Sequence, residues 1–249
     1  MSCWLDPVRA SLDARTTPVS MFVRDDDAGW VNDRLYALVE TACRASVPID
    51  VAVIPGAADA ALAREMRRAD ADLVHLHQHG CAHANHEIAG RKCEFGASRS
   101  RGQQRADIAA GRARLLDLIG DRVEPIFTPP WNRCTCVTAQ CLADLDFELL
   151  SRDASAPRFD VAALDELPVA LDWTGRRGAC AGTASWGVAI ADRIRTAHAP
   201  VGLMLHHGLM TDDDRRLVAD LLGVLSAHRN VRFGSMLALA RRATTRGVM

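Results

Sequence analysis

The sequence of 249 residues has no apolar run near the roughly 20 residues that a membrane-spanning helix needs. Residues 1–15 lack a basic stretch followed by an apolar core, so no secretory signal is indicated and a cytoplasmic location is expected. The formal net charge is only −1, with neither a basic face nor an acidic tail. This balance argues against nucleic acid or a membrane surface as a partner.

Segments that would divide the chain or build other kinds of site are also missing. There is no internal repeat, low-complexity stretch or linker, so residues 1–249 are expected to form a single domain. No G-x-G-x-x-G follows the first predicted strand, which argues against a dinucleotide-binding fold. The eight cysteines lack the two close pairs of a structural zinc site, and without an export signal they are expected to be free thiols.

Short apolar strands and helices alternate along the whole sequence. Strands are predicted at residues 19–23, 49–54, 72–76, 124–128, 147–151, 168–171, 201–205 and 231–233. Helices are predicted after a cap at Asn32, at 57–68, 105–119, 139–145 and 188–197, after a cap at Thr211, and at the C-terminus, with a long loop at 87–104. This alternation favours an α/β fold with a parallel sheet and right-handed crossovers. Seven or eight such units indicate a barrel, with an open doubly wound sheet as the second choice.

Five of the nine histidines lie within residues 75–86, where a short buried strand meets a loop. His79 and His83 stand four residues apart, a spacing that predicts one face of a helical turn and a shared metal ion. A histidine-rich surface loop is the alternative. His75 and His77 alternate with apolar residues, so hydrogen bonds in the barrel interior are expected for them.

Titratable side chains gather where the predicted strands end. They are the aspartates at 25–27, the histidine segment, the sequence PPWNR at 129–133, Asp172 with Trp173, and His206 with His207. In a parallel barrel these ends share one rim, so the side chains are expected to converge. Two imidazoles and one carboxylate can hold a zinc-like ion that activates water, a second carboxylate can take a proton, and another imidazole can protonate a leaving amine. The set suits hydrolysis of an amide.

On these residues the chain resembles the polysaccharide deacetylase family, also called the NodB-homology or carbohydrate esterase family 4 group. The family order is an Asp-Asp pair, H-x-x-x-H, an Arg-x-Pro loop, Asp-Trp and a Leu-x-His near the end. The matching positions are the aspartates at 25–27, His79 with His83, Pro129 with Pro130, Asp172 with Trp173, and Leu205 with His206. The resemblance implies a distorted (β/α) barrel of about seven strands, and N-deacetylation of an acetylated amino sugar or hydrolysis of a related C–N bond.

The resemblance also implies the ligands and the base. Asp27, His79 and His83 would bind a divalent metal, with zinc the first choice and cobalt, manganese or nickel also suited to this donor set. Asp26 would be the general base. Because three aspartates run together here, the register stays open by one, and Asp25 as base with Asp26 as ligand is the alternative.

The remaining roles concern the acid and the substrate. His206 would be the general acid, and Asp172 would keep it protonated through a carboxylate contact. The expected substrate contacts are Pro130, Trp131, Arg133, Trp173 and His86. The arginine usually found before the proline loop is Thr128 here, so Arg24 or Arg133 would have to replace it.

Three functions remain open on the sequence alone. The first is an amino-sugar deacetylase, the second a small-molecule amidohydrolase, and the third an inactive barrel that binds a saccharide. An open trench lined by Trp131 and Trp173 would favour sugars, whereas a closed pocket capped by residues 87–104 would favour a small amide. A complete set of base, ligands and acid favours an enzyme over a binding protein.

Overall fold

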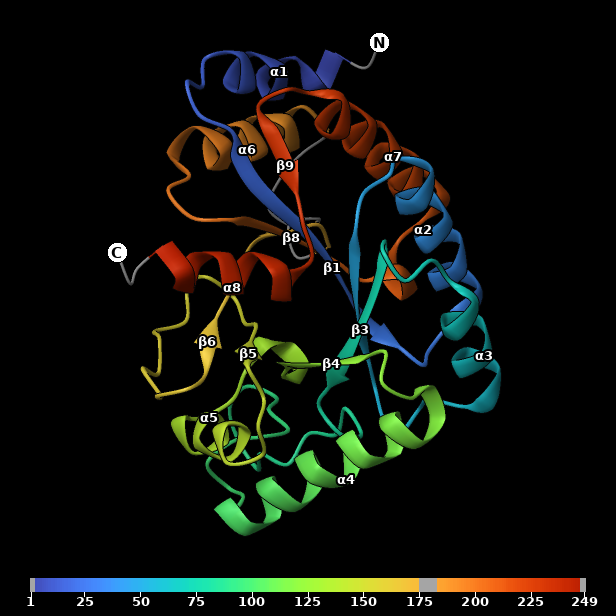
Figure 1. Cartoon of the computed structure of the whole chain (residues 1–249), viewed down its shortest axis with the longest axis vertical. Helices are drawn as coiled ribbons and strands as arrows, with labels where there is room; N and C mark the ends of the chain where they lie inside the picture. The colour runs from blue at the N-terminus through green and yellow to red at the C-terminus, as the bar shows by residue number, and fades with distance from the viewer. Residues whose placement is uncertain (1–2, 175–182, 247–249) are drawn as a thin grey trace.

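The computed structural model describes residues 3–174 and 183–246, and its strands form one parallel sheet (Figure 1). The strands are β1 (Val19–Ala28), β2 (Ile49–Val53), β3 (Val74–His79), β4 (Val123–Thr128), β5 (Leu149–Leu150), β6 (Asp165–Glu166), β7 (Val169–Asp172), β8 (Val201–Leu205) and β9 (Val231–Phe233). Their order is β6-β5-β4-β3-β2-β1-β8-β7, and β9 pairs with the start of β1. Strand β1 therefore lies between β2 and β8 at the centre of the sheet.

The two ends of this strand order meet, so the sheet curls into a barrel. Strands β6 and β7 follow each other directly in the sequence, yet β6 pairs with β5 and β7 pairs with β8. Val169 adds backbone hydrogen bonds to Arg152 and Ala154, both of 2.8 Å. Pro168 separates β6 from β7 and has no N–H to donate, which fits the interruption at this point. The predicted distorted (β/α) barrel is confirmed, and its irregularity lies at the two-residue strands β5 and β6.

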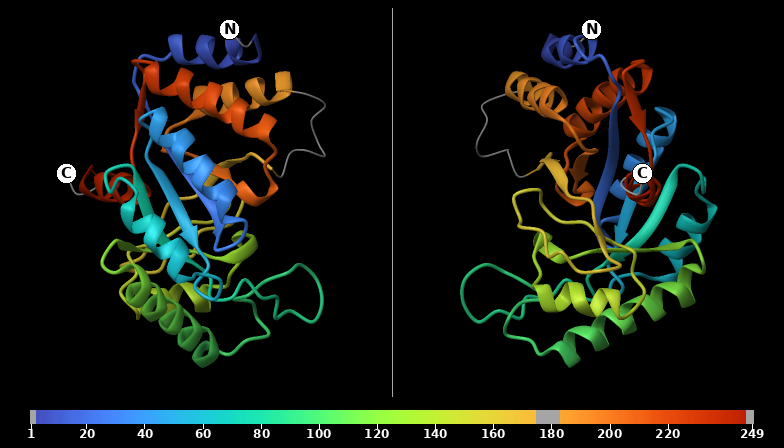
Figure 2. Two further views of the ribbon diagram at one scale, coloured as in Figure 1. Left: turned by 90° about the vertical axis from the view of Figure 1, so that its right-hand side faces the viewer. Right: turned by 60° about the vertical axis from the view of Figure 1, so that its left-hand side comes forward.

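Helices pack around the strands (Figure 1). They are α1 (Asp6–Asp13), α2 (Asn32–Arg44), α3 (Ala60–Arg68), α4 (Arg101–Ile119), α5 (Cys136–Ala143), α6 (Thr183–Thr196), α7 (Asp212–Ala227) and α8 (Met236–Arg246). Helix α7 contacts α2, α3 contacts α4, and α4 contacts α5. The loop between β3 and α4 projects from the lower end of the molecule (Figure 2). None of the helices in the described ranges is long and apolar enough to cross a membrane.

Side chains along each strand alternate between the outer helices and the barrel interior. Val23 and Leu203 belong to the outer core, together with residues of the surrounding helices. Phe22 and Met204 face the interior and pack with Met236 of α8, so α8 covers the inner face of the sheet. This covering explains why the barrel can bury charged side chains such as Arg24, since part of its interior is sealed from water.

The interior also holds the first two histidines of β3, as predicted. His75 lies 2.9 Å from a carboxylate oxygen of Glu124, and His77 lies 2.9 Å from the Thr128 hydroxyl. Burial, with some help from the charge of Arg24, lowers the pKa of His77 to about 3. His77 is therefore neutral at physiological pH.

Several local predictions differ from the structure. The side chain of Asn32 does not cap α2; the cap position is Val31, and Asn32 instead accepts a hydrogen bond from the Gly29 N–H at 3.0 Å. Helix α4 begins at Arg101 rather than 105 because Ser100 and Gln103 form a capping box. Helix α1 was not predicted, although a proline in its first turn is a usual start signal.

Candidate metal and catalytic site

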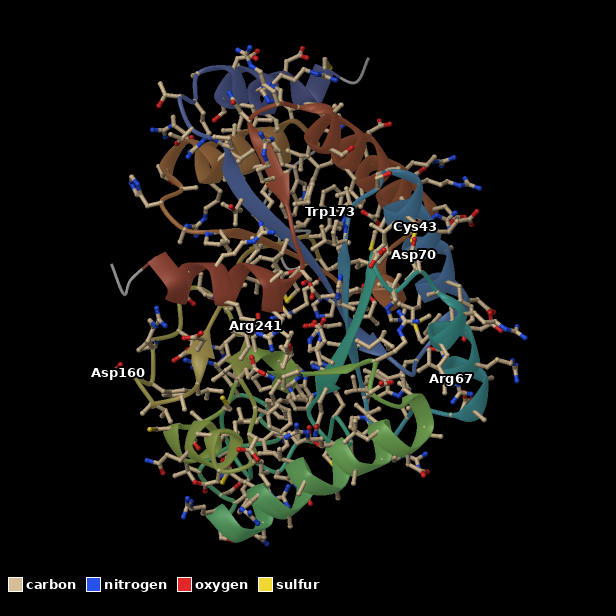
Figure 3. All side chains as sticks on the ribbon, in the orientation of Figure 1. Cys43, Arg67, Asp70, Asp160, Trp173 and Arg241 are labelled. Atoms are coloured by element: carbon tan, nitrogen blue, oxygen red, sulfur yellow. The ribbon has the colours of Figure 1, made fainter. Side chains whose placement is uncertain are left out.

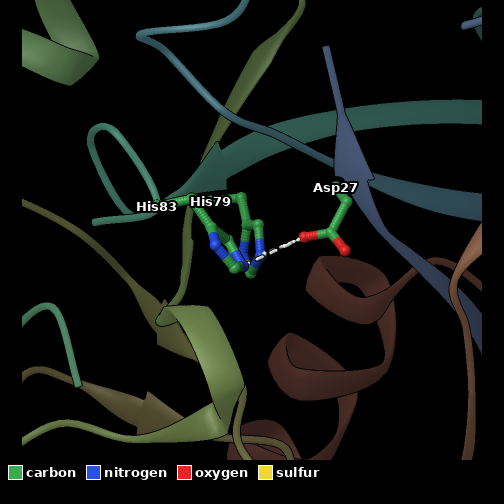
Figure 4. Close-up of side chains that lie close together, drawn as sticks. All are labelled: Asp27, His79 and His83. Atoms are coloured by element: carbon green, nitrogen blue, oxygen red, sulfur yellow. Dashed lines mark hydrogen bonds and ion pairs between the residues drawn. The ribbon is translucent and has the colours of Figure 1, made fainter. Parts of the chain in front are cut away.

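Three predicted metal ligands converge at the carboxyl ends of β1 and β3 (Figure 4). One carboxylate oxygen of Asp27 lies 3.2 Å from Nε2 of His79 and 3.2 Å from Nε2 of His83. The three ligand atoms all lie within 4.8 Å of one another. Burial alone would raise the pKa of Asp27, but hydrogen bonds to both histidines outweigh it and hold that pKa well below its ordinary value.

The hydrogen bonding of His79 suits a metal ligand. Its Nδ1 lies 3.0 Å from the backbone carbonyl oxygen of Thr128, which can only accept, so Nδ1 carries the proton. Burial lowers the pKa of His79, but the hydrogen bond to Asp27 outweighs it and raises that pKa, so Nε2 also carries a proton that it donates to Asp27. A metal would replace this proton and take the Nε2 lone pair. A backbone carbonyl behind a histidine ligand is the usual way in which proteins fix this tautomer. Two imidazole nitrogens and a carboxylate oxygen therefore fit a divalent metal ion.

A bulge in β1 brings two neighbouring aspartates to the same site. The pairing of β1 with β2 shifts register between Asp25 and Ala28, and Asp27 has a φ of 73°. Successive side chains of a regular strand point to opposite faces, and a bulge re-aims one of them. Asp26 stays on the interior face with Arg24, while Asp27 turns toward the histidines. The three consecutive aspartates therefore lie in three different environments.

His83 reaches the site through a loop, and the predicted helical turn is wrong. His79 is the last residue of β3, and His83 follows in a loop with a φ of 56°. Gly80 turns the chain with a φ of 58°, and a Cβ at this position would lie 2.2 Å from the Glu94 carboxylate. The two imidazoles do meet, but the chain brings them together through a tight turn at Gly80, where only glycine fits.

Glu94 organises this loop and was missed in the sequence. Its buried carboxylate accepts backbone hydrogen bonds from Cys81 at 3.1 Å, Ala82 at 2.7 Å and Ala84 at 3.4 Å. These three amides flank His83. No local motif links Glu94 to the histidines, so only the loop's folded path reveals the contact.

Asp26 forms a two-pronged ion pair with Arg24. The Nε of Arg24 donates to one carboxylate oxygen at 2.8 Å and a terminal nitrogen donates to the other at 2.9 Å, and both side chains are buried. Burial would raise the pKa of Asp26, but the charge of Arg24 and then of His79 outweigh it, so this pKa is lowered. Arg133, the other candidate for this role, donates instead to the carbonyl of Lys92.

Asp25 does not join this cluster. It lies on the opposite face of β1 and accepts hydrogen bonds from the backbone N–H of His207 at 2.9 Å and from its Nδ1 at 2.6 Å. The other ring nitrogen of His207 donates to the Trp30 carbonyl at 2.7 Å. Burial works against charge, but Asp25 outweighs it and raises the pKa of His207. Asp25 and His207 therefore tie the end of β8 to β1.

His206 directly follows β8, the strand that pairs with β1 on the side away from β2. Its charge contributes to lowering the pKa of both Asp26 and Asp27, so it stands close to them. Thr174 connects it to Asp172: the Thr174 hydroxyl lies 3.1 Å from Nδ1 of His206 and donates to Asp172 at 3.1 Å. The expected carboxylate contact thus runs through a hydroxyl, which holds the His206 ring through Nδ1.

Two tryptophans flank His83. The ring of Trp131 lies 4.5 Å from the His83 ring and that of Trp30 lies 4.8 Å from it, both edge to face. Pro130, which is buried, packs behind Gly80 and begins the turn that carries Trp131. Trp30 is 41% exposed and was not predicted as a site residue, because no motif distinguished it from an ordinary surface aromatic.

Two other expected substrate contacts lie elsewhere. Trp173, labelled in Figure 3, is 2% exposed; its ring stacks on Trp186 at 4.9 Å and meets Trp4 edge-on at 6.4 Å. It faces the outer core because it follows Asp172, which faces the mouth. His86 is exposed and is held only through its backbone, which bonds to Cys93 and Ser98. Neither side chain is brought to the metal cluster.

No family model and no curated protein matches this sequence. Solved structures do match its fold. A protein from Mycobacterium smegmatis assigned as a polysaccharide deacetylase superposes with a TM-score of 0.71 at 16% identity, covering 94% of this chain and 93% of that one. A family 4 acetyl xylan esterase from Clostridium thermocellum, in complex with a cobalt ion, gives a TM-score of 0.61 at 13% identity, with 92% of both chains covered.

A family 4 pseudoenzyme from Bacillus anthracis also matches, with a TM-score of 0.60 at 12% identity, covering 90% of this chain and 66% of that one. At such identities the likeness establishes the barrel fold of these proteins. Because active and inactive members share this fold, activity has to be argued from the site.

Proposed function

We propose that this protein is a metal-dependent hydrolase that removes an N-acetyl group from a substrate containing an amino sugar. One observation carries the proposal: Asp27, His79 and His83 converge beside a second carboxylate, Asp26, and a separate imidazole, His206. Ligands, base and acid for amide hydrolysis are thus held at one mouth. The structural neighbours include an esterase that binds cobalt, which agrees with this donor set.

Asp27, His79 and His83 would hold the divalent ion, with zinc the first choice and cobalt, manganese or nickel also compatible. When bound, such an ion supplies Lewis acidity: it polarises a carbonyl and makes water more acidic. Asp26 is the general base, because Arg24 keeps it ionised and it also feels the charges of His79 and His206. It takes a proton from the water that attacks the acetyl carbon.

His206 is the general acid. Through Nδ1 it is held by Thr174 and, behind that, by Asp172, so a proton on Nε2 can pass to the leaving nitrogen. The C–O bond to water forms, the C–N bond breaks, and acetate and a free amine result. Trp30 and Trp131 are partly exposed on either side of His83, where rings of this kind suit the faces of a sugar. This pair favours a sugar over a small amide.

The test is acetate release from N-acetylglucosamine and its oligomers by protein loaded with each metal in turn. His79→Ala and His83→Ala are expected to lose both the metal and the activity, because two ligands remain where three are needed. His206→Ala is expected to keep the metal and lose turnover. Full metal stoichiometry in either ligand variant, or an unchanged rate in His206→Ala, would remove the assignment.

A further inference from the structure

Three basic residues gather beside Trp131. Lys92 Nζ lies 5.9 Å from the centre of the Trp131 ring, and Arg133 donates to the Lys92 carbonyl at 3.0 Å. Arg91 directly precedes Lys92, and its charge adds to burial in lowering the pKa of Arg133. Because the Trp131 ring lies 4.5 Å from that of His83, these three residues, the basic cluster, border the metal site.

The positive charges of the basic cluster are not balanced by acids. Within residues 3–174 and 183–246, no salt bridge involves Arg91, Lys92 or Arg133, whereas Arg99 in the same loop pairs with Asp107. Two acids of the same segment serve the loop itself: Glu94 accepts from three backbone amides, and Glu87 accepts from the N–H and hydroxyl of Ser98. The Nε of Arg133 is buried without a hydrogen-bond partner.

An anion would stabilise such an arrangement. Like charges held together repel, and a buried donor without an acceptor costs free energy. A solvated loop would explain exposed arginines, but it would not explain why the chain's only lysine and two arginines meet beside the site. Guanidinium groups bind phosphate and carboxylate through paired hydrogen bonds, and a lysine adds a point charge.

We propose that the substrate carries a phosphate or carboxylate, which Arg91, Lys92 and Arg133 bind while its acetamido group occupies the site beside His83. The inference rests on the proposed function and adds the chemical class of the substrate. It separates anionic saccharides, such as sugar phosphates and acidic sugars, from neutral polymers.

The first test compares kcat/KM for N-acetylglucosamine, its 1-phosphate and 6-phosphate, and N-acetylmuramic acid. An anionic substrate is expected to be favoured at least about tenfold at low salt, and this preference should shrink as ionic strength rises. The double variant Arg91→Gln/Lys92→Gln should lower the ratio of anionic to neutral kcat/KM by about tenfold. Arg64→Gln, an exposed change on α3, is the matched control and should keep the ratio. Equal use of neutral and anionic substrates, or an unchanged ratio in the double variant, would overturn the inference.

The second test does not depend on turnover. Because Lys92 is the only lysine, its acylation by an amine-reactive reagent can be followed by mass spectrometry, with the N-terminal amine as internal reference. N-Acetylglucosamine 6-phosphate should protect Lys92, and N-acetylglucosamine should not, with or without metal in the site. Protection without acetate release from any substrate would refute the proposed deacetylation alone. If neutral sugars are deacetylated and no anionic sugar protects Lys92, the anion-binding role of the basic cluster is refuted while the proposed function stands.

Discussion

Arg24 controls the ionisation of the proposed base, and this gives a prediction about pH. Its ion pair with Asp26 is buried, so removing the guanidinium leaves a carboxylate that burial pushes toward the neutral form. Arg24→Gln is therefore expected to move the acid limb of the kcat/KM profile upward by roughly one pH unit or more. Arg24→Lys keeps a positive charge beside Asp26 and should therefore show a smaller shift. If the acid limb of both variants lies at the same pH as that of the natural chain, Asp26 is not the base. Circular dichroism must first show that the variants fold, because breaking a buried pair costs about 3–5 kcal/mol.

Glu94 is expected to set metal affinity without touching the metal. Glutamine offers one acceptor oxygen where the carboxylate offers two, so Glu94→Gln should loosen the amides on either side of His83. Groups that orient ligands in this way typically contribute about 10–100-fold to metal affinity. Competition with a chromophoric chelator measures the change. Glu87→Gln, in the same loop but bonded to Ser98, is the control, and equal affinity in the two variants would contradict the role.

At the scale of single residues, the sequence predicted which chemical groups meet in the site but not which neighbouring residues hold them in place. His79 and His83 were selected for their spacing after a strand with a local apolar pattern, and Asp27 through the order of motifs that the deacetylase family shows. Glu94 and Trp30 have no such pattern around them. Their contacts depend on the path of a loop and on a bulge, and neither leaves a periodic signal in the sequence.

Among the elements, strands buried on both faces were the easiest to predict and their ends the hardest. Strand β3 was expected to stop at residue 76 because His77 to His79 are polar, yet it continues to His79. The alternate residues His77 and His79 face a barrel interior that accepts polar groups, so a rule that equates burial with apolar character ends the strand early. Strand β6 is two residues long and was missed for lack of any pattern.

Asp50 links β2 to the start of α8 and should make stability depend on pH. It is buried, accepts from the Met236 N–H at 3.1 Å, and burial raises its pKa to about 8. The folded state therefore holds this proton more tightly than the unfolded chain. Its stabilising effect is complete below the unfolded pKa of about 4 and is lost as pH rises toward 8.

The variant Asp50→Asn cannot ionise and should remove this dependence. Urea unfolding at pH 5 and pH 8.5 is expected to show the variant gaining stability relative to the natural chain at the higher pH. Because other titrating groups are common to both proteins, the difference between them isolates Asp50. A difference that is the same at both pH values would mean that Asp50 is ionised in the folded protein throughout this range.

For the whole molecule, the proposed metal site joins the ends of two strands and a loop. Asp27 ends the central strand, His79 ends β3 and His83 lies in the projecting loop, so an ion bound there favours the folded state only. At a free concentration about 1,000 times its Kd, a metal stabilises by about 4 kcal/mol, which for a chain of this size raises Tm by roughly 10 °C. Eight cysteines give the unfolded chain thiol ligands of its own for zinc, which would reduce the shift.

Manganese, which binds thiols weakly, is therefore the cleaner probe of this coupling. Thermal unfolding should show Tm rising with manganese and returning to the metal-free value after a chelator is added. His83→Ala should match the natural chain without metal and show little of the rise, because its site has lost one of three ligands. The same rise in His83→Ala would place the stabilising ion elsewhere on the molecule, and the convergence of Asp27, His79 and His83 would then be a hydrogen-bonded cluster with no metal role.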